Sequence, residues 1–400
     1  MEKRIGFYVL SFLIALSLSV VIIPINAGAE GIEGLKFFGD VRARFELDSR
    51  TRLSGTTYQD QERDRFRYRL RAGFNYTASE NIEIGGRLSS GDTNDANSPH
   101  NILGSKDNGD GTNDSSNYAF SRDSVSIDKA YVKGKYLDGF LWVGKNDIPF
   151  YEQNEYYWDA DINPEGIGLG YTLKGIGPLS ITLQGGYFIM KEGSWNQTGK
   201  GDVDSDMKTY QGVVKGGIDF LDFTAAYGVA STSISAGTRI RSQAGASTVC
   251  TSATGCATSG AGTTPASEVS THFIGDFSLT SLQVKVKAIT DVPITLGYDM
   301  MKGSGDTIKD KDAGSVLNAG ISFKDFSVLL MLPDIETNAV TGFAQDDWPN
   351  YYNNFKGTEA RLGYKIAKNI NVDFRYFSGE RKTDTKQKEA RNQINFNVSF

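Results

Sequence analysis

The sequence predicts an all-β fold: a transmembrane antiparallel β-barrel of about sixteen strands. Apolar and polar residues alternate with a period of two along many stretches, as they do in strands with two different faces. The connections between these stretches alternate between tight turns and long polar segments. The 400 residues also include 45 glycines, 19 tyrosines and 23 phenylalanines but only nine prolines. This composition suits a meander of strands better than a helical bundle.

The first 29 residues have the pattern of an export signal. A basic start, MEKR, precedes an apolar run over residues 5–23, and the small residues Ala27, Gly28 and Ala29 follow it. We therefore expect a cleaved signal peptide over residues 1–29 and a barrel over residues 30–400. An uncleaved membrane anchor is the alternative, because the run is longer than a usual signal.

An arginine row marks the second predicted strand. Arginine stands at every second position of residues 63–71, with aromatic and aliphatic residues between from Phe66 onward. Arginine on a lipid-facing side costs roughly 2–4 kcal/mol near the membrane midplane, so the arginines must face the lumen. They would form a ladder that lines the pore. Its members are Arg63, Arg65, Arg67, Arg69 and Arg71.

Further inward-facing bases fall on the first strand and on the closing strands. Since the last strand must pair with the first, these bases collect on one sector of the wall. The residues 63–71 have few inward acids beside them in sequence, so we expect the arginines to generate a field. The alternative is a wall in which they pair with acids such as Asp40, Glu46, Glu359 and Asp373. The further bases are Arg42, Arg44, Arg361, Arg375 and Arg391.

Seven tight turns and eight long connections imply about sixteen strands, with both chain ends on the periplasmic side. We expect a long connection at residues 49–62 and a bulge near residues 127–132. A soluble sandwich or a solenoid is the alternative. A solenoid needs a fixed repeat, which the sequence lacks, and a sandwich would rarely hold so long a chain as one domain. The longest loops are expected at residues 92–122, 147–165, 235–268 and 334–356.

The third long connection, residues 147–165, combines aromatic residues with acids. Folded into the lumen, its acids would face the arginine ladder, narrow the pore and set up a transverse field. A surface loop with solvated acids is the alternative. The candidate constriction acids are Glu152, Glu155, Asp159, Asp161 and Glu165.

Several segments, in order, resemble the putative porin family and, more broadly, the general porins of Gram-negative outer membranes. General porins place their third loop in the lumen, with acids facing a basic wall cluster. The resemblance implies passive diffusion of small solutes and a trimer. Beyond residue 180 only the strand rhythm and the C-terminal phenylalanine match. The segments are FFGDVRARFELD, RDRFRYRLRAGFNYTASENIEIGGRLSSGD, SIDKAYVKGKY, LWVGKNDIPF and WDADINPEGIGLGYTL.

Three smaller features remain. Phe400 ends an aromatic alternating strand and resembles the signal read by the outer-membrane assembly machinery; an ordinary strand end is the alternative. Cys250 and Cys256 share one loop, and export makes them a disulfide candidate. The segment KDNGDGTND is a weak calcium candidate, because its spacing does not complete a calcium loop. Its acids are Asp107, Asp110 and Asp114.

We predict an outer-membrane porin of a Gram-negative cell that passes small hydrophilic solutes by diffusion, favours anions, has no cofactor and is no enzyme. Expected partners are outer-membrane lipid, the assembly machinery, small hydrophilic or anionic solutes and two further copies in a homotrimer. Nucleic acid is not expected, since the basic run alternates with lipid-facing aromatic residues. One alternative is a substrate-specific channel for phosphate or an acidic oligosaccharide. Another is a non-conducting surface adhesin or receptor barrel.

Overall fold

The computed structural model describes twelve segments of the chain, and the expected export signal lies outside them. Residues 36–400 form one structural unit; of the unit before it, Met1–Leu35, only residues 32–35 are described. Within the described residues, no helix is long and apolar enough to cross a membrane. The segments are residues 32–54, 56–91, 99–103, 123–151, 155–191, 205–233, 239–242, 245–248, 277–305, 311–339, 347–348 and 353–400.

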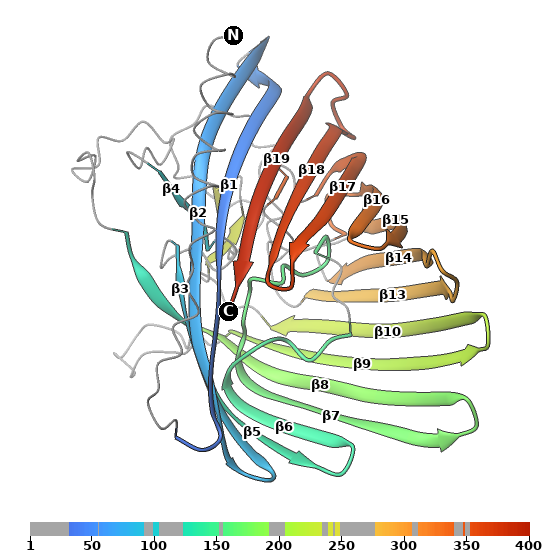
Figure 1. The fold of residues 1–400 in the computed structure, drawn as a ribbon. Coiled ribbons are helices and arrows are strands. Elements are labelled where there is room, and N and C mark those ends of the chain that lie inside the picture. Colours follow the sequence, from blue (N-terminus) through green and yellow to red (C-terminus); the bar gives the residue numbers. More distant parts are fainter. Residues whose placement is uncertain are drawn as a thin grey trace, which may run out of the picture. The chain divides into compact units, whose positions relative to one another are not determined.

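Sixteen strands form a closed antiparallel barrel, as predicted (Figure 1). The last strand pairs with the first, from Asp40 opposite Ser399 to Arg50 opposite Glu389, and this closes the sheet. The barrel strands are β1 (Leu35–Ser54), β2 (Thr57–Ser79), β3 (Ile82–Ser90), β5 (Val125–Tyr136), β6 (Gly139–Lys145), β7 (Glu165–Ile176), β8 (Leu179–Lys191), β9 (Ser205–Ile218), β10 (Leu221–Ser233), β13 (Phe277–Ala288), β14 (Ile294–Gly305), β15 (Ala313–Phe323), β16 (Phe326–Ile335), β17 (Phe355–Ala367), β18 (Ile370–Arg381) and β19 (Lys388–Ser399). The short strands are β4 (Asn101–Ile102), β11 (Arg239–Ser242) and β12 (Gly245–Thr248).

The alternation of residues places apolar side chains outside and polar or small ones inside. On β7, Ile167 and Leu169 are exposed on the outer surface, whereas Gly168 between them faces inward and is buried. A Cβ at Gly168 would lie 2.4 Å from the indole of Trp142 on β6, so the inward ring requires glycine here. An apolar outer face with a polar interior is the pattern of a barrel whose outer surface meets lipid.

The first hairpin differs from the prediction. We expected a long connection at residues 49–62, but β1 and β2 continue through this stretch and only residues 55–56 join them. Cross-strand hydrogen bonds hold the polar ends together: Arg50 Nε donates to Gln61 Oε1 at 2.6 Å, and Thr51 Oγ1 donates to Asp60 Oδ1 at 2.7 Å. Polar residues outside the membrane therefore extend the hairpin instead of ending it.

The expected bulge near residues 127–132 is present. The pairing of β3 with β5 shifts register between Arg87, opposite Lys129, and Leu88, opposite Ile127. One extra residue, Asp128, thus stands on β5. Extra residues of this kind bend a strand and redirect its side chains.

Candidate functional site

The described parts of the connection between β6 and β7, residues 146–151 and 155–164, lie inside the barrel (Figure 1). Its Asp161 Oδ1 is 3.0 Å from Arg71 Nη1 on β2, and its Glu155 Oε2 is 2.7 Å from Arg361 Nη2 on β17. The Tyr151 backbone N–H donates to Gln211 on β9 at 2.6 Å. These strands lie apart around the barrel, so a segment that touches all of them must cross the lumen. The contacts agree with the inward-folding interpretation.

Aromatic residues fix this inner loop to the wall. Tyr156, Tyr157 and Trp158 are almost fully buried and belong to one apolar cluster with wall residues such as Trp142 and Phe188. Each such ring contributes roughly 1.5–3 kcal/mol by leaving water. Burial raises the pKa of the Tyr156 hydroxyl well above its ordinary value, so this group stays protonated and can donate a hydrogen bond.

Two of the predicted constriction acids face the arginines. Glu155 binds Arg361, and Asp161 lies 3.0 Å from Arg71 and 3.7 Å from Arg69. Burial alone would raise the pKa of Glu155, but the charges of Arg361 and Arg375 and the hydrogen bond from Arg361 together outweigh it and hold that pKa below its ordinary value. Glu155 is therefore ionised at neutral pH and narrows the lumen as a charged group.

The other predicted acids lie elsewhere. Asp159 is buried, and its Oδ1 accepts the backbone N–H of Asp161 at 2.8 Å, so it shapes the turn. The prediction for Glu165 is wrong: it begins β7, shares the outward face with Ile167, and pairs with Lys145 at 2.8 Å. The alternation of β7 imposes this direction. Glu152 lies outside the described residues.

The arginine ladder lies on the inner face of β2, but our expectation that too few acids stand beside it is wrong. Alternation also turns acids of β1 inward, next to the ladder, because residues 40, 46 and 48 share one face. Each of these five arginines forms an ion pair with an acid, as the alternative interpretation expected. Arg63 pairs with Asp48 at 2.7 Å. Arg65 and Arg67 both pair with Glu46, and the distance from Arg67 to Glu46 is 3.1 Å. Arg69 and Arg71 pair with Asp40 at 2.6 Å and 2.7 Å.

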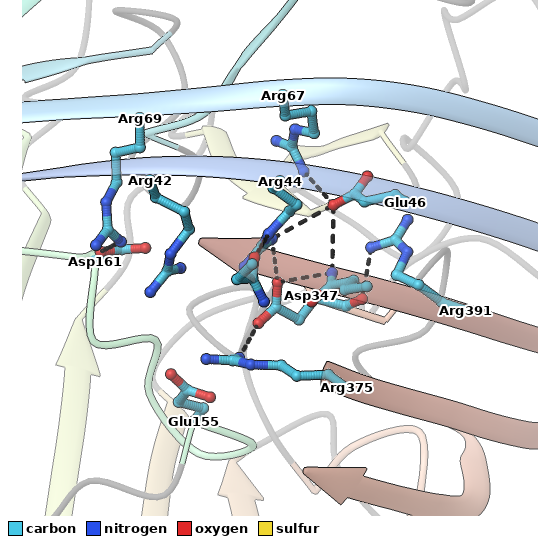
Figure 2. A network of polar contacts seen from close by, with 12 residues as sticks. Arg42, Arg44, Glu46, Arg67, Arg69, Glu155, Asp161, Asp347, Arg375 and Arg391 are labelled. Carbon is cyan, nitrogen blue, oxygen red and sulfur yellow. Dashed lines mark hydrogen bonds and ion pairs between the residues drawn. The ribbon is translucent and has the colours of Figure 1, made fainter. Parts of the chain in front are cut away.

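Four of the other five arginines are also paired, and Figure 2 shows Arg44 and Arg375 against Asp347. Arg361 bridges to the inner loop, as described above. The rest meet acids of the wall and of the connection between β16 and β17. Arg44 lies 2.8 Å from Asp347, Arg375 lies 2.8 Å from Asp347 and 3.0 Å from Asp373, and Arg391 lies 2.6 Å from Asp48.

Arg42 differs from the other nine arginines, since it has no ion pair within the described part of the chain. Its Nε donates to Asn397 Oδ1 at 2.6 Å. Figure 2 shows its guanidinium group reaching into the lumen between Arg69 and Arg44. Arg42 therefore presents a positive charge that forms no direct ion pair with a carboxylate of the described residues.

Asp347 and Trp348, to which the sequence alone assigned no role, also lie in the lumen. Trp348 is fully buried, and its Nε1 donates to the Tyr156 hydroxyl of the inner loop at 2.9 Å. A signal was present: the stretch QDDWPNYYNNF mixes acids with aromatic residues, as the inner loop does. That composition is typical of a segment that packs on a charged wall.

A cavity of about 620 Å³ separates the inner loop from strands β10 to β18. Charged groups of both signs line it, with amides and small residues between them. A solute in this space would meet hydrogen-bond donors and acceptors on all sides. The charged lining residues are Glu155, Lys285, Asp299, Arg361, Asp373 and Arg375.

The remaining sequence predictions are placed as follows. The Phe400 backbone exchanges two hydrogen bonds of 3.0 Å with Gly39, which extends the closing pair of strands; its role in assembly stays a prediction. The calcium candidates Asp107, Asp110 and Asp114 and the cysteines Cys250 and Cys256 lie outside the described residues. Within the described segments, no three His, Cys, Asp or Glu side chains are grouped to hold a metal ion.

Known proteins resemble this chain in fold and, over part of its length, in sequence. In the fold comparison, Pseudomonas putida OprB has 11% identity and a TM-score of 0.54 over 92% of this chain and 94% of that one. The outer membrane channel DcaP of Acinetobacter baumannii has 12% identity and a TM-score of 0.46, over 92% and 97% of the chains. A search of curated proteins finds no match. Residues 41–212 match the model of the family described as putative porin, so the family resemblance seen in the sequence is confirmed.

Proposed function

We propose that the chain forms a water-filled channel in the outer membrane of a Gram-negative cell and lets small hydrophilic solutes diffuse through it. The observation that carries the proposal is the cavity of about 620 Å³ between the inner loop and the barrel wall. Its volume is that of pockets which hold small molecules. Its polar and charged lining can replace the hydration of a passing solute.

We further propose a preference for anions. Nine of the ten predicted arginines form ion pairs with eight carboxylates of the described residues, so this set of ten arginines and eight carboxylates has two more positive than negative charges. Arg42 supplies one of them. An excess of positive charge in a narrow lumen raises the local concentration of anions. The eight carboxylates are those of Asp40, Glu46, Asp48, Glu155, Asp161, Asp347, Glu359 and Asp373.

Transport in this proposal needs no bond to form or break, and no cofactor. A solute enters from the side of the long connections, passes between the inner loop and the wall, and leaves at the tight turns. The ion pairs keep the arginine side chains in fixed positions, so the lumen does not close on a bound solute. Because binding at any one group is weak, passage stays fast.

The expected partners belong to the same proposal. The apolar outer face would contact outer-membrane lipid, and Phe400 would be read by the assembly machinery after the export signal is removed. Two further copies would complete a homotrimer. The sequence pattern and the family resemblance support these three expectations about lipid, assembly and trimer formation.

A second candidate is a substrate-specific channel for phosphate or an acidic oligosaccharide. The dense row of arginines on β1, β2 and β17 to β19 favours it, since such a wall could pass an anion from one guanidinium group to the next. This channel would show a conductance that saturates as the concentration of its own anion rises. A general diffusion channel would show a conductance proportional to salt concentration.

Planar-bilayer recording of the purified protein tests both candidates. We expect stepwise single-channel conductance and, in a potassium chloride gradient, a reversal potential of the sign that an anion-preferring pore gives. No conductance at any concentration would refute the channel and leave the adhesin or receptor alternative. Cation preference would refute the role given to the arginines.

A further inference from the structure

The carboxylate of Asp347 occupies a site whose donors come from three strands (Figure 2). Arg44 Nη1 on β1 and Gln393 Nε2 on β19 lie 2.8 and 3.3 Å from Oδ1, and Arg375 Nη1 on β18 lies 2.8 Å from Oδ2. Arg391 Nη1 donates to the backbone carbonyl of the same residue at 2.5 Å. Charged donors on both oxygens make a binding site for a carboxylate.

Other wall residues hold these donors in place. Arg44 is 1% exposed, and its Nε donates to Asn395 Oδ1 at 2.6 Å. Arg375 Nε donates to Asp373 Oδ1 at 3.0 Å. Because these bonds do not involve Asp347, the site keeps its shape when that carboxylate is absent.

The carboxylate itself comes from the connection between β16 and β17. An aromatic anchor positions it: the ring of Trp348, the next residue, lies 4.7 Å from that of Phe355 and 5.5 Å from that of Phe377. Its Nε1 also donates to Tyr156 of the inner loop. Asp347 is therefore an acid that a second connection brings into the lumen and places against the arginines.

Electrostatics keep this acid ionised. Burial would raise the pKa of Asp347, but the charges of the surrounding arginines together outweigh it and hold that pKa well below its ordinary value; these are Arg44, Arg375, Arg361 and Arg42. At neutral pH the group therefore carries a full negative charge. It neutralises guanidinium groups that would otherwise face a passing solute.

We propose that Asp347 is a specificity-determining residue of the channel: its carboxylate fills a carboxylate-binding site in the arginine wall and withholds Arg44 and Arg375 from passing anions. The inference rests on the proposed channel function. Without the Asp347 charge the wall gains one net positive charge. With the side chain removed, the site is open to a small carboxylate from solution.

The first test compares ion selectivity in planar bilayers. Asp347→Asn keeps the size of the side chain and removes its charge, so we expect the ratio of chloride to potassium permeability to rise about threefold or more. The matched control is Asp384→Asn. Asp384 lies in the connection between β18 and β19, and its side-chain oxygens bond to Tyr58 and Gln387, with no arginine among their described partners. We expect this control to change the ratio little.

The second test uses formate as a probe of the open site. In Asp347→Gly, formate should occupy the site and lower the chloride conductance, with a dependence on formate concentration that saturates. The wild-type channel should show no saturating block, because Asp347 already fills the site. Equal block of both proteins would overturn the proposal, since formate would then act elsewhere.

Failure of the channel proposal is distinguishable from failure of this one. If the wild type does not conduct, the channel proposal fails. If it conducts and Asp347→Asn leaves the permeability ratio unchanged, the role of Asp347 fails alone. Folding is checked by heat-modifiable migration on a detergent gel, where a closed barrel runs faster than the unfolded chain; both Asp347 variants should keep it because the strand pairing does not involve residue 347.

Discussion

Replacing Arg42 tests whether the charge excess of the wall determines selectivity. Arg42→Gln removes the one guanidinium group of the ten without a carboxylate partner among the described residues, and glutamine can still donate to Asn397. At about 5 Å in a water-like lumen, one unit charge stabilises an anion by roughly 0.8 kcal/mol. This corresponds to a change of about fourfold in relative permeability. The assay is the reversal potential in a potassium chloride gradient, which should move toward the potassium equilibrium potential.

The control for this prediction is Arg42→Lys, which keeps the charge and should keep most of the anion preference. Selectivity that stays at the wild-type value in Arg42→Gln would refute the reasoning, because the unpaired charge would then contribute nothing to permeation. A loss of equal size in Arg42→Lys would also refute it, since hydrogen bonding and not charge would be responsible.

Three further predictions concern the inner loop and its neighbours. Glu155→Gln leaves the charge of Arg361 less neutralised, so anion selectivity should rise by about twofold to fourfold in the same assay; an unchanged value would mean that ions do not pass this pair. Trp348→Ala removes a fully buried ring and its hydrogen bond to Tyr156, and the loss of such a ring costs about 3–5 kcal/mol of folding stability in a packed core. Single-channel recordings of this variant should show larger conductance and more noise, and Trp348→Phe should be intermediate. The difference in selectivity between the wild type and Asp347→Asn should be as large at pH 3.8, the ordinary pKa of an aspartate, as at pH 7, because the pKa of Asp347 is held well below that value and the wild type keeps this charge until the pH falls through the lowered pKa; a difference that shrinks by about half at pH 3.8 would show that Asp347 titrates normally.

The barrel was predictable from the sequence because its constraint acts on every residue. A strand between lipid and lumen must alternate, and a slip of one residue would move its arginines into lipid. This is why the direction of Arg65 and the bulge at residues 127–132 could be predicted. The length of the first hairpin could not be predicted. Outside the membrane its polar residues need not alternate with apolar ones, so they have the composition of a loop.

The pairing of the arginines was harder to predict, since it depends on the register between strands. The sequence of β2 shows five bases and one acid in residues 63–71, which suggests an unpaired ladder. Their partners Asp40 and Glu46 lie on β1, and whether they stand beside the ladder depends on how two strands align. Asp347 is more than 250 residues away from the ladder in sequence; its acidic and aromatic surroundings resemble those of the inner loop, but they do not indicate which arginines it meets.

Among the described residues, two connections each bring an acid to the arginine wall next to an aromatic anchor. Glu155 precedes Tyr156, and Asp347 precedes Trp348, and the two rings are joined by a hydrogen bond of 2.9 Å. An ionised side chain costs several kcal/mol to bury unless it is paired, so the ring next to it must position it close to its arginine. The shared arrangement means that the two acids depend on one another through Tyr156 and Trp348. We therefore expect the effects of Glu155→Gln and Trp348→Ala on selectivity to be non-additive in a double-mutant cycle, whereas the effects of Arg42→Gln and Glu155→Gln should add.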